Sequence, residues 1–381
     1  MLGKSEIAWG QSEAMLESQS LFPSICKQMK TVYIHAGNLK TGSSALQAFC
    51  SRHRNWLGSR GINYLVSARP RRNHDTHSAL PLSLLKELGC YTPLWYDDNV
   101  IFQDIAATVK TEINNSDLPG QLISSEEFYR FGTFSPKVQA KAIEQLQALF
   151  HGYDVRVILY IRGPMEFMVS WYKEVNEEPV PRPRFSKYFM KIPKAYLDPT
   201  STASFLRQCF GDDALRVLPY TNSSTDHIQK FLQEIGVNDS PYREQERAIV
   251  NQSRPEYEIE PRRLARIVAQ LPVEDREEFA QSSATDNGST YSEFCRKIDS
   301  INLAFSEFCH AESLDLDYQP LNADEMLETE ARLNSHKCKR PGFIAIARAK
   351  FETPSTRTRV WTIIDILGLS RLFQRMFNRT N

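Results

Sequence analysis

A short loop that combines two glycines with a lysine lies near the start of the chain and has the composition of an anion-binding loop. Residues 31–36 form a β-branched, aromatic run, which predicts a buried strand. Gly37, Lys40 and Gly42 follow it, and Ser43 then begins a predicted helix that has an apolar side and runs to about residue 59. Unpaired amides at a helix N-terminus, together with the helix dipole, favour a bound phosphate or sulfate.

The order of residues in this loop differs from that of an ATP-binding P-loop. In the pattern G-x-x-x-x-G-K-[ST] the lysine follows the second glycine. Here Lys40 and Thr41 precede Gly42, and two hydroxyl residues, Ser43 and Ser44, come after it. For this segment alone, an ordinary turn between a strand and a helix with a surface lysine is the alternative interpretation.

A second candidate phosphate site follows the predicted strand over 155–161. Arg162 comes directly after this strand, and Ser170 lies eight residues further along, on a predicted helix over 165–176. A guanidinium group offers forked donors that suit a phosphate dianion, and the serine hydroxyl adds another donor on the same helix. A sheet-edge ion pair for Arg162 and a surface position for Ser170 are the alternatives.

Taken in order, these segments resemble the sulfotransferase family that uses 3′-phosphoadenosine 5′-phosphosulfate (PAPS), over roughly residues 31–236. The strand over 216–220 and the helix after it resemble the adenine-side segment of that family. The resemblance implies an α/β fold of the P-loop NTPase-like sulfotransferase type, with a central, mainly parallel sheet flanked by helices and a helical C-terminal extension. It implies PAPS as co-substrate, no metal, and these cofactor-binding residues: Gly37, Lys40, Thr41, Gly42, Ser43, Ser44, Arg162, Ser170 and Tyr220.

Transfer to a hydroxyl acceptor needs a general base, for which Glu126 is the first candidate. It follows the predicted strand over 121–125, at the sheet edge where ligands of parallel sheets bind, in a segment where the resembled family carries a catalytic His or Glu. Burial there would raise the pKa of its carboxyl toward neutrality. The alternatives are one neighbouring acid and three histidines: Glu127, His35, His74 and His77.

Composition excludes some classes of function. The 381 residues carry 46 basic and 46 acidic side chains, so the formal net charge of zero argues against a general nucleic-acid binder. The chain shows no apolar run long enough for a membrane span and no secretion signal, which predicts a cytoplasmic protein. Its seven scattered cysteines form no CxxC pair, as expected for reduced thiols.

Four regions are expected along the chain. They are an N-terminal arm (1–30), an α/β core (31–255), a helical part (256–353) and an amphipathic tail helix (354–381). Within the α/β core, residues 177–202 are expected to form a Pro/aromatic insertion that lies over a site and is not part of the hydrophobic core.

The tail helix is the part of the chain that suggests partners. Residues 361–379, placed on a helix, present one broad apolar face beside a row of arginines. This face predicts docking on the core or on a second copy of the chain, or peripheral contact with an anionic membrane.

The sequence therefore predicts a sulfotransferase that acts by in-line displacement on a hydroxyl of a carbohydrate or glycolipid. Lys40 would stabilise the charge that develops on the bridging oxygen, and Glu126 would accept the proton. A P-loop kinase or NTPase is one alternative, although the lysine is misplaced and no strand-end aspartate for Mg²⁺ is evident. A non-catalytic scaffold that binds nucleotide is the other alternative.

Overall fold

The computed structural model describes residues 29–71, 73–93, 95–96, 99–176, 180–220, 224–239, 241, 256–270 and 291–334. Almost all of the expected N-terminal arm and the whole of the expected tail helix lie outside these residues. The membrane and oligomer contacts expected for the tail therefore remain sequence-based expectations.

A sheet of five parallel strands forms the centre of the protein, in the order β2-β3-β1-β4-β5. The apolar side chains of β1 and the last residues of β4 are buried, as expected for strands covered on both faces. The predicted α/β class with a parallel sheet is thus confirmed. The strands are β1 (Thr31–His35), β2 (Ile62–Tyr64), β3 (Gly120–Ser124), β4 (Asp154–Ile161) and β5 (Leu215–Pro219).

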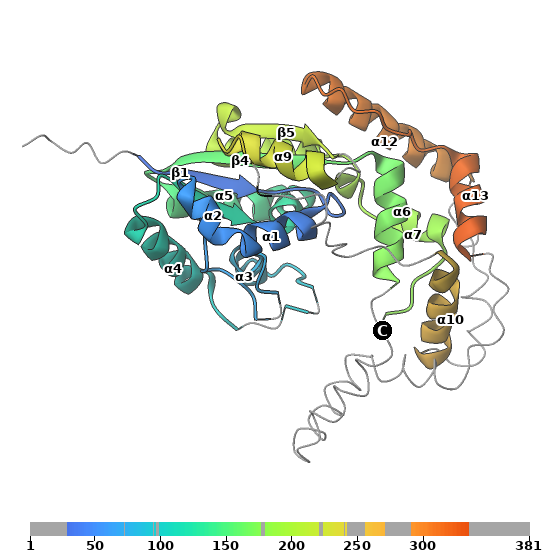
Figure 1. Ribbon diagram of the computed structural model, residues 1–381. Helices are drawn as coiled ribbons and strands as arrows, with labels where there is room; N and C mark the ends of the chain where they lie inside the picture. Colours follow the sequence, from blue (N-terminus) through green and yellow to red (C-terminus); the bar gives the residue numbers. More distant parts are fainter. Residues whose placement is uncertain are drawn as a thin grey trace, which may run out of the picture.

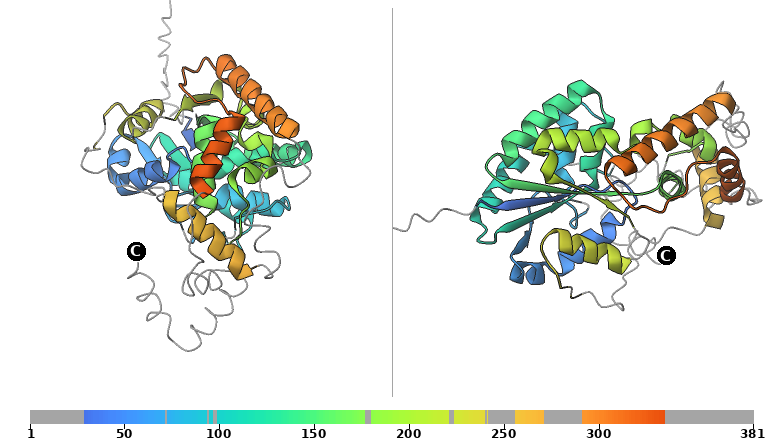
Figure 2. Two further views of the ribbon diagram at one scale, coloured as in Figure 1. Left: turned by 90° about the vertical axis from the view of Figure 1, so that its right-hand side faces the viewer. Right: turned by 90° about the horizontal axis from the view of Figure 1, so that it is seen from above.

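Helices cover both faces of this sheet (Figures 1 and 2). One face packs through Leu46, Phe49 and Phe231 against α1 (Ser43–Arg52), α2 (Arg54–Ser59) and α9 (Ser224–Glu234). The other face carries a larger apolar core. Its helices are α3 (Ala79–Glu87), α4 (Phe102–Asn115), α5 (Pro136–Phe150) and α8 (Thr200–Phe210).

A group of helices extends past the carboxyl end of the sheet, on the right of Figure 1. It has an apolar core of its own, built around residues such as Phe167, Phe185, Phe189 and Met326. Its helices are α6 (Pro164–Val175), α7 (Phe185–Lys191), α10 (Ile259–Gln270), α12 (Tyr291–Ala311) and α13 (Ala323–Asn334). Short 3₁₀ helices are η1 (Glu126–Thr133), η2 (Lys194–Tyr196), η3 (Asp212–Ala214) and η5 (Glu256–Glu258).

The Pro/aromatic segment over 177–202 is more than a cover over a site. Phe185 and Phe189 on α7 are fully buried, and Ile192 is nearly so. The interpretation of these aromatics as lying outside a core is therefore wrong, because proline-rich composition alone does not reveal which rings a neighbouring helix will cover.

Two features of the helices also differ from expectation. The helix after the glycine loop was expected to continue to about residue 59, but it breaks at His53 into α1 and α2. Helix α3 has no counterpart among the predicted elements, since residues 79–85 are apolar or small and all buried and leave no polar face to mark a helical period.

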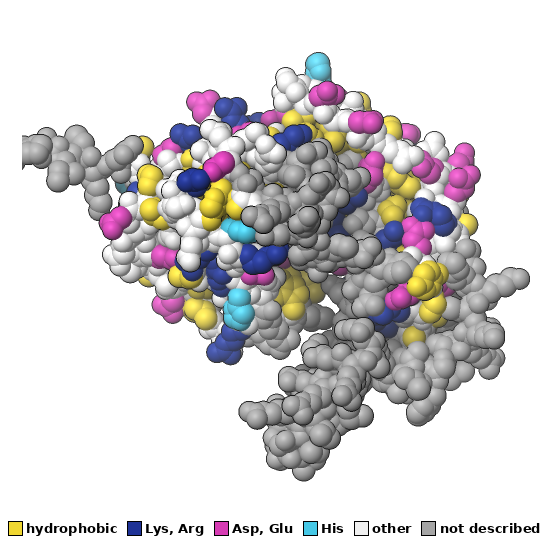
Figure 3. Space-filling view, viewed as in Figure 1, with side chains coloured by type: hydrophobic (Ala, Val, Ile, Leu, Met, Phe, Trp, Pro, Cys, Tyr) yellow, Lys and Arg dark blue, Asp and Glu magenta, His cyan; other side chains and the backbone are white. Residues whose placement is uncertain are grey.

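Three features of the described residues concern membrane spans, cysteine thiols and surface charge. None of the helices in the described ranges is long and apolar enough to cross a membrane. All five cysteines within those ranges are free thiols. On the face shown in Figure 3, the side chains of Lys and Arg are mixed with those of Asp and Glu, in keeping with the zero net charge.

Candidate functional site

The candidate site lies at the carboxyl end of β1, where the chain changes from one face of the sheet to the other. After β1 the chain enters α1 on one face, whereas after β3, the neighbouring strand, it continues to α5 on the opposite face. β4 flanks β1 on its other side. Such a switch point opens a crevice beyond the strand ends, which is the usual ligand site of an open parallel sheet.

The loop after β1 is fixed to its neighbour β4. The amide of Ala36 donates a hydrogen bond to the carbonyl of Ile158 at 2.9 Å, and the amide of Asn38 donates to that of Tyr160 at 2.8 Å. Inside the loop, Thr41 Oγ1 donates to the carbonyl of Asn38 at 2.6 Å. These bonds give the loop a defined shape before any ligand binds.

Two loop residues adopt left-handed backbone conformations, Lys40 with φ 64° and Gly42 with φ 76°. Gly42 is the N-cap residue of α1. Among the described residues, the amides of Thr41, Gly42 and Ser43 donate to no backbone acceptor. Amides that alternate with left-handed residues at a helix start form a concavity that suits an anion, so an anion site at this loop stays a prediction compatible with its backbone.

Ser43 and Gly42 show features of a binding cradle. The Ser43 side chain is buried, yet its Oγ has no hydrogen-bond partner among the described residues. A Cβ at Gly42 would lie 2.9 Å from Cε2 of Tyr220 and 3.1 Å from Nε2 of His227, so any other residue there would force one of these rings to move. Buried hydroxyls are nearly always hydrogen-bonded, and a ligand at the α1 N-terminus would supply the missing partner.

Arg162 joins the second predicted phosphate motif to the first. It follows β4, and its Nη1 donates to the carbonyl of Lys40 at 2.9 Å. Its guanidinium carbon lies 5.1 Å from the centre of the Tyr220 ring, close enough for a cation–π contact. Arg162, Lys40 and Tyr220, which are distant in sequence, are therefore brought together at one place.

Three other predicted residues have different surroundings. A Cβ at Gly37 would lie 2.8 Å from Thr41 Oγ1 and 3.0 Å from His35 Nε2, so close packing requires glycine there. Ser44, in the first turn of α1, and Ser170, on α6, are partly exposed, and neither side chain hydrogen-bonds to a described residue. The structure thus gives the two serine hydroxyls no assigned role.

Glu174 pairs with the Lys40 ammonium group, and Glu126 interacts with its charge. Lys40 Nζ lies 3.4 Å from Oε2 of Glu174 on α6, and Gln47 Nε2 on α1 donates to Glu126 Oε2 at 3.4 Å. Burial raises the pKa of Glu126 to about 7, and the charges of Glu127 and Glu174 add to this effect. The hydrogen bond from Gln47 and the charge of Lys40 lower the pKa of Glu126 and offset part of this increase. A carboxyl with this pKa can exchange protons near neutral pH.

Two of the alternative bases have their polar atoms engaged. The Glu127 carboxylate accepts a hydrogen bond from Arg130 Nη1 at 2.9 Å in a buried ion pair. His77 Nε2 lies 2.8 Å from the carbonyl of Leu65, and His77 Nδ1 accepts from the Ser124 amide at 3.0 Å. The two contacts of His77 anchor the ends of β2 and β3 beside the site.

The other two alternative bases differ in their surroundings. His35 Nδ1 lies 2.8 Å from Ser124 Oγ, whereas its Nε2 is buried with no partner among the described residues. His74 lies on the exposed loop after β2.

Three residues of the site were missed by the sequence-based prediction: Gln47, Glu174 and His227. Glu174 had a usable signal, since it lies four residues after Ser170 and therefore on the same face of α6. Gln47 lies one turn after Ser43 on α1. His227 lies on α9, and only the packing of α9 beside α1 brings it to Gly42.

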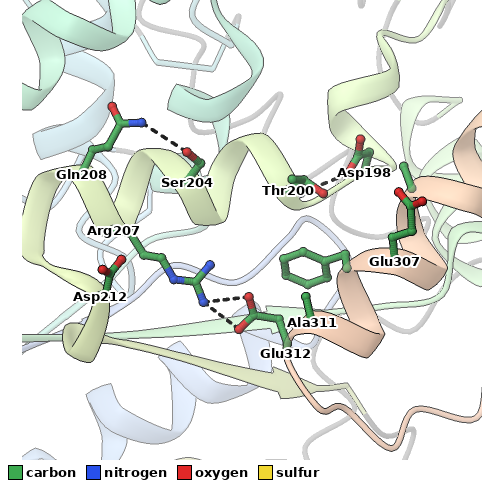
Figure 4. A pocket seen from close by; sticks show the side chains of 11 residues that line it. Asp198, Thr200, Ser204, Arg207, Gln208, Asp212, Glu307, Ala311 and Glu312 are labelled. Atoms are coloured by element: carbon green, nitrogen blue, oxygen red, sulfur yellow. Dashed lines mark hydrogen bonds and ion pairs between the residues drawn. The ribbon is translucent and has the colours of Figure 1, made fainter.

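A separate cavity of about 780 Å³ lies between α8 and α12 (Figure 4). Arg207 and Glu312 form an ion pair across it at 2.7 Å, and Asp198 and Glu307 also line it. None of the predicted site residues lines this cavity.

No protein-family model, curated protein or solved structure showed a match to this chain. Within the described part of the chain, no three His, Cys, Asp or Glu side chains gather in a way that could hold a metal ion. The structure therefore defines the chain as an α/β protein with a glycine-containing loop at the switch point of a parallel sheet.

Proposed function

We propose that this protein is a PAPS-dependent sulfotransferase of the P-loop-like fold, which transfers a sulfuryl group to a hydroxyl of a carbohydrate or glycolipid. The observation that carries the proposal is the hydrogen bond from Arg162 Nη1 to the Lys40 carbonyl. It brings a guanidinium group next to a loop whose unpaired amides suit an anion. PAPS has anionic groups on both its 5′ and 3′ sides and needs two such sites, whereas a simple mononucleotide needs one.

The residues of the site divide between the two ends of the nucleotide. The free amides of Gly42 and Ser43, with the unpartnered Ser43 hydroxyl, would hold the 5′-phosphate. Arg162 would bind the 3′-phosphate with Ser170, and Tyr220 would lie on the adenine side. PAPS supplies an activated sulfuryl group on a stable leaving group, and the protein supplies binding and position.

Sulfuryl transfer, like phosphoryl transfer, depends on in-line positioning and on stabilisation of developing charge. The acceptor oxygen forms a bond to sulfur while the bond from sulfur to the bridging phosphate oxygen breaks. The acceptor proton passes to the Glu126 carboxylate, and adenosine 3′,5′-bisphosphate leaves. Lys40 would stabilise the charge on the bridging oxygen, for which it must exchange its contact with Glu174.

The pKa of Glu126 suits the role of base. A carboxyl with a pKa of about 7 is deprotonated in a large fraction of molecules at neutral pH and is more basic than an ordinary glutamate. The hydrogen bond from Gln47 would hold its orientation.

The proposal is tested by measuring release of adenosine 3′,5′-bisphosphate from PAPS in EDTA, with and without a panel of glycans and glycolipids. We expect acceptor-dependent release and labelled sulfate in the acceptor, both strongly reduced in Lys40→Ala. Hydrolysis of ATP with Mg²⁺, together with no consumption of PAPS, would contradict the proposal in favour of an NTPase.

A further inference from the structure

His227 is the buried side chain of this site with the largest unmet hydrogen-bonding capacity. It is 2% exposed, and neither Nδ1 nor Nε2 has a partner among the described residues. His35, another buried histidine beside the site, has one partner, because its Nδ1 lies 2.8 Å from Ser124 Oγ. A fully buried imidazole without a partner is costly, so a bound group is the natural explanation.

The surroundings of His227 hold its ring in place. The ring lies 4.3 Å from that of Tyr160 and 5.4 Å from that of Tyr220, measured between centroids. The Tyr160 hydroxyl donates to the His227 carbonyl at 3.1 Å, which fixes this turn of α9. The orientation of the imidazole is therefore determined by packing before a ligand binds.

The ring faces the start of α1. Its Nε2 lies 3.1 Å from the position that a Cβ of Gly42 would occupy, and Gly42 is the N-cap of the helix. The next residue, Ser43, carries the unpartnered buried hydroxyl. Burial lowers the pKa of His227 to about 4, so the ring is neutral at pH 7 and carries one N–H donor.

We infer that His227 is a further binding residue of the site, whose ring N–H donates a hydrogen bond to the 5′-phosphate of the nucleotide held at the start of α1. The inference rests on the proposed function, because it takes the bound anion to be the 5′ group of a 3′-phosphorylated nucleotide. A neutral donor adds affinity without adding charge, so it complements Lys40 and leaves the charge balance of the site unchanged.

The test compares two nucleotides by isothermal titration calorimetry, adenosine 3′,5′-bisphosphate and adenosine 3′-monophosphate. His227→Phe keeps a flat ring but removes both nitrogens, and His151→Phe, at the exposed end of α5, is the matched control. We expect His227→Phe to weaken binding of the bisphosphate about tenfold and to leave binding of the 3′-monophosphate unchanged. The His151 variant should bind both nucleotides as the wild type does.

An equal loss for both nucleotides, or no loss, would overturn the role of His227. If His227→Phe does not fold, ¹⁵N-histidine spectra of the wild type decide the matter. The bisphosphate should then shift the ring-nitrogen resonances of His227, and the 3′-monophosphate should not; the same shift with both would overturn the inference. Failure of the wild type to bind the bisphosphate would overturn the proposed function and this inference together.

Discussion

Arg162 Nη1 donates a hydrogen bond to the carbonyl oxygen of Lys40 at 2.9 Å, across 122 residues of sequence. The bond ties the end of β4 to the loop after β1 at the point where Lys40 has a left-handed backbone. An arginine has five N–H donors, and among the described residues this is the only hydrogen bond that Arg162 makes. Arg162 can therefore fix the loop and still bind an anion.

Replacing Arg162 should weaken nucleotide binding more than catalysis. In Arg162→Ala the loop loses its tether and the ligand loses a charged donor, so adenosine 3′,5′-bisphosphate should bind at least tenfold more weakly by calorimetry. The affinity of Arg162→Lys should lie between those of the wild type and Arg162→Ala, because lysine keeps the positive charge but lacks the forked donors of the guanidinium group. Arg156→Ala, on the exposed part of the same strand, is the control and should bind normally. Equal affinities for Arg162→Ala and Arg156→Ala would contradict the assignment.

Lys40 should act mainly in the transition state. Lys40→Ala should lower the turnover number by roughly 10²–10³-fold with a smaller effect on bisphosphate affinity, as for other groups that stabilise developing charge. Lys173→Ala is a matched control, since Lys173 also pairs with a glutamate and its side chain is 18% exposed, against 19% for Lys40. Kinetics with PAPS measure both variants. A loss confined to KM would speak against this role for Lys40.

The activity should rise with pH through the pKa of Glu126. A base must be deprotonated, so we expect kcat to increase with pH around 7 and then level off. Glu126→Gln should abolish this rise and most of the turnover while it still binds the bisphosphate. Near-full turnover in Glu126→Gln would show that another group is the base.

The same pKa predicts a change in stability. The folded pKa of about 7 lies above the ordinary value of 4.5, so the folded state holds a proton that the unfolded state releases. The contribution of Glu126 is fully present below pH 4.5 and is lost as the pH rises to about 7. Denaturant unfolding at several pH values should show a smaller decrease over this range in Glu126→Gln than in the wild type. Identical slopes would contradict the raised pKa.

Glu174 should tune both Lys40 and Glu126. Its negative charge is one of the causes that raise the pKa of Glu126. Glu174→Gln should therefore shift the pH–rate profile to lower pH. It should also strengthen bisphosphate binding, but only a few-fold, because the partly exposed ion pair between Lys40 and Glu174 contributes little. Glu144→Gln, on the exposed side of α5, should leave the profile unchanged. A profile that moves to higher pH in Glu174→Gln would rule out this coupling.

Two glycines with the same backbone conformation allow the cost of backbone strain to be distinguished from the cost of a steric clash. Gly42 and Gly236 have φ of 76° and 79°, but a Cβ at Gly42 would lie 2.9 Å from Tyr220, whereas none of the described atoms lies within 4 Å at Gly236. Gly236→Ala should cost about 1 kcal/mol of unfolding free energy. Gly42→Ala should cost more and should also abolish bisphosphate binding. Equal costs with binding retained would argue against a closely packed cradle.

The parts of the site that lie close together in the sequence were predictable, and the parts assembled by packing were not. The strand, the glycine loop and the start of α1 follow from a continuous stretch, and Glu126 follows from its place after a strand. Gln47 and Glu174 enter the site through helix faces that become neighbours only after folding. His227 depends on the placement of α9 against α1, to which its own sequence gives no clue.

The most direct test of the central claim is calorimetry of the wild-type protein with adenosine 3′,5′-bisphosphate in EDTA, and with ATP in Mg²⁺. The account predicts clear binding of the bisphosphate without metal and weak or no binding of ATP. A ligand bound only by the native state should also raise thermal stability. Binding of ATP with Mg²⁺ and none of the bisphosphate would contradict the account.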